Sequence, residues 1–137
     1  MAANPILFAE IGVSPKSDFD LVKLTKEGFP VETVDAIKKQ GLTFTEISDI
    51  VISPRTLKYR KARGEALSRE ESERVIRVSR TIELADKIFG SHDKAMSWLR
   101  NPDERYENTS PLYLLDTDGG GRLVEKLLWR IAEGVYA

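Results

Sequence analysis

The sequence predicts an all-α fold, on the basis of hydrophobic spacing, paired helix start and stop signals, and the lack of strand-like alternation. From residue 18 onward, apolar residues recur at intervals of three and four, which places them on one face of a helix. Ser, Thr or Pro precedes most of these runs and Gly follows them, as expected of helix caps. No segment alternates apolar and polar residues over a useful length. We therefore expect a helical bundle.

The composition excludes several classes of protein. The chain has 137 residues, of which 41% are hydrophobic and 31% charged, which is ordinary for a soluble globular protein. It contains no cysteine, so disulfides and thiolate metal sites are excluded. It has no run of about 18 apolar residues, the length that crosses a bilayer. The apolar N-terminus lacks the basic flank of a signal peptide. We expect a cytoplasmic protein with no membrane segment.

The first part of the chain predicts an arm and two helices. Residues 1–17 show no sustained period and are interrupted by proline and glycine, so we expect an N-terminal arm. A helix should begin at Asp18 and end at Gly28, and a second should begin at Pro30 and stop at Gly41. Their apolar contacts are assigned to Phe19, Leu21, Val22 and Leu24 in the first helix and to Val31, Val34 and Ile37 in the second.

Two shorter helices follow. Either Thr43 or Thr45 caps the first of them. Ser53 is a good N-cap for the second, Pro54 suits its first position, and Gly64 closes it. The apolar side of the first helix is assigned to Phe44, Ile47, Ile50 and Val51, and the inward anchor of the second to Leu57.

A long helix is predicted from about Ser68 to Phe89. Ser68 with Glu71 three residues later forms a capping-box pattern. Its main apolar stripe is Val75, Val78, Ile82, Ala85 and Phe89. Ser91 then caps a further short helix that stops at Asn101-Pro102.

The C-terminal part predicts a loop, a short helix, a break and a final helix. Residues 102–110 are polar and should form the loop, after which Ser110-Pro111 opens the short helix. Residues 116–121 contain three consecutive glycines and are interpreted as a break. The last helix is expected over residues 122–133, with Val124, Leu127, Leu128 and Ile131 on one face.

Charge is distributed unevenly along this nearly neutral chain, whose formal net charge is −1. Residues 53–80 hold nine basic and four acidic residues, a net charge of +5. Residues 1–52 and residues 102–137 each have a net charge of −3. One short block therefore produces a concentrated positive field between acidic ends, which favours an anionic partner for that block.

The segment 43–64 predicts a helix-turn-helix. Its first helix is apolar enough to be buried, and its second contains five basic residues, no acid and a single aromatic, Tyr59. A helix-turn-helix places its second helix in the major groove of DNA, which is wide enough for one helix. The segment therefore predicts DNA binding, and the alternative is a solvated basic face with no partner.

The predicted DNA-binding residues occupy the start and the outer side of this second helix. Its cap and first turn should approach base edges or the nearest phosphates, because Arg binds guanine through two bonds and Ser or Thr can bond to either group. Residues further along should hold the phosphate backbone. The full set is Ser53, Arg55, Thr56, Lys58, Tyr59, Lys61 and Arg63. Because a monomer with about five phosphate contacts binds weakly, we expect a homodimer on paired half-sites.

Other motifs favour structure over chemistry. Adjacent residues such as Ser91-His92-Asp93 do not face one another in a helix, so they form no catalytic triad. Residues 119–121 lack the Lys-Ser or Lys-Thr and the preceding strand of a P-loop. Asp116 and Asp118 are suitable ligands for a hard cation, but the remaining ligands of a calcium loop are missing. We predict no catalytic residue, no metal and no cofactor, and therefore no enzyme.

The C-terminal third contains a distinct series of motifs. They are Trp98-Leu99, then Pro111-Leu112-Tyr113-Leu114-Leu115, then Asp116-Thr117 with Gly119 to Gly121, and finally Arg130-Ile131-Ala132-Glu133-Gly134. This order resembles the toxin-binding domain of the Xre/MbcA/ParS-type antitoxins, which are partners of RES-domain toxins in bacteria. The resemblance is dense over residues 95–137 and extends more loosely back to the segment 43–64. The run of three glycines is richer than the single glycine of that pattern.

The resemblance implies an organisation and a function. After an arm at 1–17, it implies an Xre-like helix-turn-helix region at 18–67 and a helical dimerisation and toxin-binding domain at 68–137. It implies a toxin that resembles ADP-ribosyltransferases and consumes NAD, an antitoxin that covers the toxin's NAD cleft, and repression of its own operon through operator DNA. By position, the residues implied at the cleft are Trp129, Arg130, Glu133, Gly134, Val135, Tyr136 and Ala137.

Several alternatives stay open from the sequence. The chain can be a stand-alone helix-turn-helix transcriptional regulator whose C-terminal domain dimerises or senses an effector. A small hydrolase or metalloprotein using His92, Asp116 and Asp118 is a third class. Trp98 and Trp129 have a simple alternative as core residues, and Tyr136 as a frayed terminus that contacts nothing.

Overall fold

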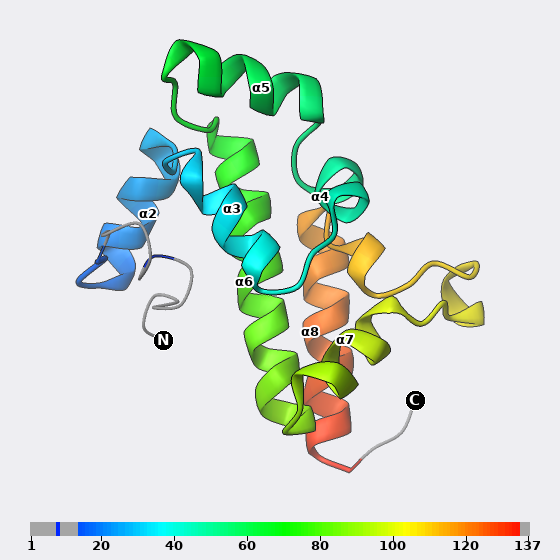
Figure 1. The fold of residues 1–137 in the computed structure, drawn as a ribbon. Helices are drawn as coiled ribbons and strands as arrows, with labels where there is room; N and C mark the ends of the chain where they lie inside the picture. The colour runs from blue at the N-terminus through cyan, green and yellow to red at the C-terminus, as the bar shows by residue number, and fades with distance from the viewer. Residues whose placement is uncertain (1–7, 9–13, 135–137) are drawn as a thin grey trace. The chain divides into compact units, whose positions relative to one another are not determined.

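The computed structural model describes Phe8 and residues 14–134, and within them it confirms the all-α prediction (Figure 1). The extended pairing in this part of the chain is limited to an isolated bridge between Asp103 and Thr109. The chain divides into two compact units between Ser79 and Arg80, inside the long helix. The domain boundary expected from the sequence lay before that helix. None of the helices in the described ranges has both the length and the apolar content needed to cross a bilayer.

The described N-terminal unit is built from short helices and the beginning of a long one. These are α2 (Asp18–Glu27), α3 (Glu32–Lys39), α4 (Phe44–Ile50), α5 (Pro54–Arg63) and the first part of α6 (Arg69–Phe89). Thr43, rather than Thr45, caps α4, because its hydroxyl accepts from the N–H of Glu46 at 3.2 Å while its own N–H donates to the Glu46 carboxylate at 2.9 Å. Gly64 ends α5 in the left-handed region, with a φ of 65°.

The core of the N-terminal unit is formed by buried faces of α3, α4 and α6 and by the segments between the helices, whereas α2 and α5 contribute no buried residue. Its buried apolar residues include Phe8, Phe29, Val34, Ile37, Ile47, Ile50, Leu67, Val75 and Val78. Phe8 comes from the segment predicted as an arm, yet its ring packs edge-on against Phe29, with centroids 5.2 Å apart. Residues 1–7 and 9–13 of that segment lie outside the described residues.

Three aromatic or aliphatic residues assigned to apolar contacts are in fact exposed. Phe19 and Val22 of α2 are 67% and 47% exposed, and Phe44 of α4 is 64% exposed. On α2 the half-buried apolar residues are Leu21 and Leu24, which lie one turn apart on the other face. Phe44 is the first residue of α4 and precedes the turn whose apolar residues are buried. The assignment of these three residues to the core was wrong.

The C-terminal unit comprises the end of α6, then α7 (His92–Arg100), two 3₁₀ turns, η1 (Glu104–Tyr106) and η2 (Leu112–Leu114), and α8 (Asp118–Ala132). Figure 1 shows α7 and the orange-to-red α8 beside the last turns of α6. The buried residues of this unit include Ile82, Ala85, Ala95, Leu99, Leu112, Leu115, Val124 and Leu128. The hydrophobic stripes predicted for α6 and α8 therefore supply much of this core.

The predicted break before the last helix was wrong from Asp118 onward. Thr117 caps α8 by accepting from the N–H of Gly120 at 3.0 Å, so the three glycines form the first turn of the helix instead of interrupting it. A Cβ at Gly120 would overlap the backbone carbonyl of Leu114 in η2. Glycine is required there because the backbones of η2 and α8 approach closely.

Candidate functional site

The turn between α4 and α5 is held from both sides. Val51 and Ile52 are buried, and both of their N–H groups donate to the carbonyl of Ile47, at 2.9 and 3.0 Å. From α6, Arg74 donates through Nε to the carbonyl of Val51 at 2.8 Å. The turn therefore has its backbone groups satisfied, which fixes the direction in which α5 leaves it.

The start of α5 is organised by two hydroxyl groups. Ser53 is the N-cap, and its hydroxyl accepts from the N–H of Thr56 at 3.1 Å and donates to the hydroxyl of Thr56 at 2.8 Å. Both residues were predicted to contact DNA, and the structure places them next to each other at the exposed end of the helix, beside Arg55. Their hydroxyls already form one local network, so any DNA contact must share or replace these bonds.

The basic side chains of α5 fall into two groups. No residue of α5 is buried. Arg55 and Lys58 are exposed and form no ion pair within the described part of the chain. Lys61 and Arg63 are exposed but lie near acids, with Lys61 Nζ 3.7 Å from Asp35 and Arg63 Nε 3.2 Å from Glu65. The guanidinium of Arg63 also lies 5.1 Å from the ring centre of Tyr59, a residue that is 53% exposed.

Arg60 has a different role from the other cations of α5. It donates to the Glu71 carboxylate through Nε at 2.7 Å and Nη2 at 3.1 Å. Burial raises the pKa of Glu71, but the hydrogen bonds from Arg60 and Ser68 and the nearby positive charge outweigh it, so the pKa is lowered overall. The same ion pair raises the pKa of Arg60, against the smaller effect of burial. The contact between Arg60 and Glu71 was not predicted from the sequence. The only sequence signal at Glu71 was the capping box that it forms with Ser68.

A second exposed surface lies at the end of α8. Trp129 is 50% exposed, and Arg130 and Glu133 are also exposed. The alternative that Trp129 is a core residue was therefore wrong. Gly134 follows with a φ of 80°. The remaining predicted toxin-binding residues, Val135, Tyr136 and Ala137, lie outside the described residues.

The residues considered for catalysis or metal binding are not brought together. Nδ1 of His92 contacts Asp86 at 2.8 Å, while Ser91 caps α7 by accepting from the N–H of Lys94 at 3.3 Å. Asp118 forms an ion pair with Arg122 at 3.0 Å on an exposed face of α8. In the part of the chain that is described, no group of three or more His, Cys, Asp or Glu residues is arranged to hold a metal.

Comparison with known families assigns each surface to a domain. The antitoxin Xre-like helix-turn-helix domain matches residues 20–80, which include α4 and α5. The antitoxin Xre/MbcA/ParS C-terminal toxin-binding domain matches residues 84–134, which include α7 and α8. Both surfaces described above therefore lie within matched domains.

Relatives extend this likeness over most of the chain. Antitoxin Xre of Pseudomonas putida is 34% identical over 118 residues, which cover 86% of this chain and 74% of that protein. Antitoxin Xre of Yersinia enterocolitica is 32% identical over 134 residues, which cover 96% of this chain and 90% of that protein. A chain from the crystal structure of the Mycobacterium tuberculosis MbcT–MbcA toxin–antitoxin complex matches with a TM-score of 0.57 and 29% identity, covering 78% of this chain and 96% of that chain. The protein therefore belongs to the Xre/MbcA/ParS family of antitoxins, with an Xre-like helix-turn-helix domain followed by a C-terminal toxin-binding domain.

Proposed function

We propose that this antitoxin neutralises a RES-type, NAD-consuming toxin by covering its active-site cleft, and represses its own operon by binding operator DNA as a homodimer. The observation that carries the proposal is that one chain presents an exposed basic helix, α5, in its helix-turn-helix domain and an exposed end of α8 in its toxin-binding domain. The match to a chain of a toxin–antitoxin complex supports a protein partner for the second surface.

For the toxin, we assign the contact to the C-terminal end of the chain. Trp129 and Arg130 are exposed in the last turn of α8, the exposed Glu133 is its C-cap, and the chain continues through Gly134. Residues 102–137 have a net charge of −3, which complements the basic cleft expected of an enzyme that binds a nucleotide. We infer that the cleft is covered by this group together with Val135, Tyr136 and Ala137.

For DNA, we assign base and near-phosphate contacts to the start of α5 and backbone contacts to its outer side. Arg55 and Lys58 are exposed and have no competing ion pair among the described residues, so they should contribute most of the charge. Ser53 and Thr56 lie beside them, and Tyr59, Lys61 and Arg63 continue along the helix. One such helix offers few phosphate contacts, so two copies on paired half-sites would be needed for tight binding.

The toxin assignment is tested by co-expression with the neighbouring reading frame, which we expect to encode a RES-domain toxin. We expect the two proteins to elute together in size-exclusion chromatography, and NAD to be preserved in cells that carry both. Separate elution with continued loss of NAD would contradict the proposal. If the chain also bound operator DNA in that case, the stand-alone regulator would be favoured instead.

A further inference from the structure

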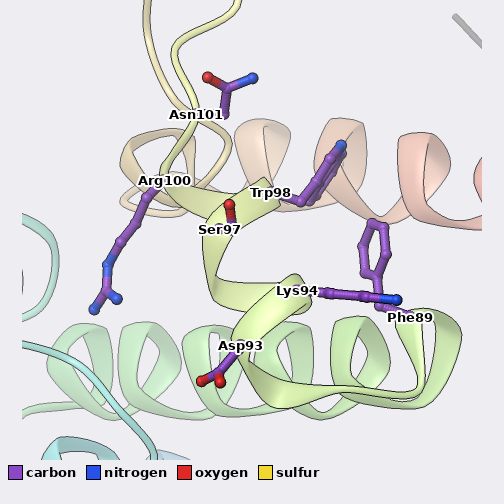
Figure 2. Close-up of a pocket in the computed structure, with 7 residues that line it drawn as sticks. All are labelled: Phe89, Asp93, Lys94, Ser97, Trp98, Arg100 and Asn101. Atoms are coloured by element: carbon purple, nitrogen blue, oxygen red, sulfur yellow. The ribbon is translucent and has the colours of Figure 1, made fainter.

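A shallow, open hollow lies along α7 in the C-terminal unit, at the junction with the end of α6, and its lining includes Asp93 and Arg100 as well as aromatic residues. Figure 2 shows Phe89, Lys94 and Trp98 together on one side of α7, whereas the side chains of Asp93 and Arg100 point to the other side. The rings of Phe89 and Trp98 are 5.9 Å apart and tilted by 40°. We call Phe89, Lys94 and Trp98 the aromatic shelf.

The aromatic shelf is a surface feature and not part of the core. Phe89, the last residue of α6, and Trp98 of α7 are only half-buried, whereas Ala95 and Leu99 of α7 are fully buried. Within the described residues, the indole N–H of Trp98 makes no hydrogen bond, and Figure 2 shows it pointing away from Phe89. A tryptophan that leaves both a ring face and its N–H available is suited to a partner, because buried Trp normally finds an acceptor for this group.

The chemistry of the shelf limits what it can bind. Two adjoining aromatic rings favour an apolar side chain, and half-exposed aromatic residues are typical of interface hot spots. The exposed ammonium of Lys94 favours a carboxylate beside that side chain. The fitting partner segment therefore carries an apolar residue flanked by an acidic one. This is opposite in charge to the partner expected for the acidic C-terminal end.

We propose that the aromatic shelf is a second docking site for the toxin, separate from the contact made by the C-terminal end. This inference rests on the proposed function, since it takes the toxin as the partner. The shelf lies within residues 84–134, the region that matches the toxin-binding domain, and Figure 1 shows α7 beside α8. Two contacts on one partner bind more tightly than either alone, provided that the partner spans both sites.

The charge of the shelf is tested with Lys94→Glu, matched by Lys87→Glu, a reversal at an exposed lysine of α6 that does not line the hollow. We expect Lys94→Glu to weaken binding of the purified RES-type toxin by about tenfold or more, measured by isothermal titration calorimetry. Lys87→Glu should stay within about twofold, because surface charges outside an interface contribute little. If both variants were folded, as judged by circular dichroism, and had equal effects on toxin binding, the proposal that the aromatic shelf binds the toxin would be wrong.

The aromatic part is tested by ¹⁹F NMR on antitoxin labelled with 5-fluorotryptophan and mixed with unlabelled toxin. The chain has two tryptophans, so two resonances are expected, and Trp98→Phe and Trp129→Phe assign them. We expect the toxin to shift the Trp98 resonance.

A complex in which only the Trp129 resonance moves would contradict toxin binding at the aromatic shelf while supporting the proposed function. Absence of any complex would overturn both. A Trp98 resonance that changes with antitoxin concentration alone would assign the shelf to a second copy of this chain and refute a toxin site.

Discussion

At the scale of single residues, one carboxylate joins the basic helix to the rest of its unit. Glu71 is 7% exposed and accepts from the Ser68 N–H at 2.7 Å and from two nitrogens of Arg60. It therefore caps α6 and holds the last turns of α5 with the same group. We expect Arg60 to position α5 and its exposed neighbours to carry the contacts with DNA.

Glu71→Gln should destabilise the protein by about 1–3 kcal/mol, because it removes a buried charged acceptor from Arg60 and leaves that guanidinium poorly paired. Urea denaturation measures the change. Glu70→Gln is the matched control, since Glu70 lies in the same turn but is exposed, and it should change stability by less than about 0.5 kcal/mol. If both variants had the same small effect, the ion pair would not hold α5.

The same residue predicts a pH dependence. Its pKa in the folded state is below the ordinary value of 4.5, so the unfolded chain binds more protons between the two pKa values and stability rises with pH there. The contribution of Glu71 should be fully present above about pH 5 and be lost as pH falls through the folded-state pKa. The difference in unfolding free energy between wild type and Glu71→Gln should therefore shrink below pH 4.5. A difference that grew on acidification would contradict the lowered pKa.

At the scale of secondary-structure elements, the sequence predicted what local signals control and failed where distant contacts decide. Ser53, Ser68 and Ser91 start helices as predicted, because an N-cap bonds to its own first turn. The start of α8 was missed, because the need for Gly120 comes from the backbone of Leu114 in another element. The exposure of Phe19 and Phe44 likewise could not be predicted, since spacing shows which residues share a helix face but not which face packs against the rest of the protein.

The glycines of α8 give a matched pair of variants. A Cβ at Gly119 has no atom within 4 Å, whereas one at Gly120 overlaps the Leu114 carbonyl. Gly119→Ala should stabilise the protein by about 0.5–1 kcal/mol through helix propensity. Gly120→Ala should destabilise it by about 1–3 kcal/mol through overpacking. Thermal denaturation followed by circular dichroism checks both signs, and two shifts in the same direction would argue against the close approach of η2 and α8.

Helix α5 predicts a measurable salt dependence of DNA binding. Replacing Arg55 and Lys58 with Ala should leave the helical circular dichroism signal unchanged, because both side chains are exposed, and should abolish binding to operator DNA at physiological salt. Each lost phosphate contact should reduce the slope of log K against log salt by about 0.9, measured by fluorescence anisotropy at low salt. Arg60→Lys is the contrasting variant. It should weaken DNA binding without changing the salt slope, because we expect Arg60 to position α5 and its exposed neighbours to contact the phosphates. If the Arg55 and Lys58 double variant bound operator DNA with unchanged affinity, the assignment of DNA binding to α5 would be wrong.

At the scale of the whole molecule, two segments of opposite net charge fall largely in two different units, each with its own buried residues. Residues 53–80 have a net charge of +5 and residues 102–137 of −3. The sequence alone shows this separation, because the formal charge of a segment does not depend on how the chain folds. It could not show that Arg60 turns towards Glu71, nor that Trp98 and Phe89 form a shelf, because both depend on residues that meet only after folding. Separate units should allow each function to be removed without the other.

Deleting residues 133–137 tests this separation. The deletion begins after Ala132, the last residue of α8, and removes no buried residue among those described, so the fold should persist. We expect the shortened antitoxin to bind operator DNA with unchanged affinity but to leave the RES-type toxin active, as measured by NAD loss on co-expression. The Arg55 and Lys58 double alanine variant is the reciprocal control and should neutralise the toxin while failing to bind the operator. Full neutralisation by the shortened chain would show that the C-terminal residues do not cover the cleft. Loss of DNA binding in the shortened chain would show that the two surfaces are coupled, because no residue of α5 is altered by the deletion.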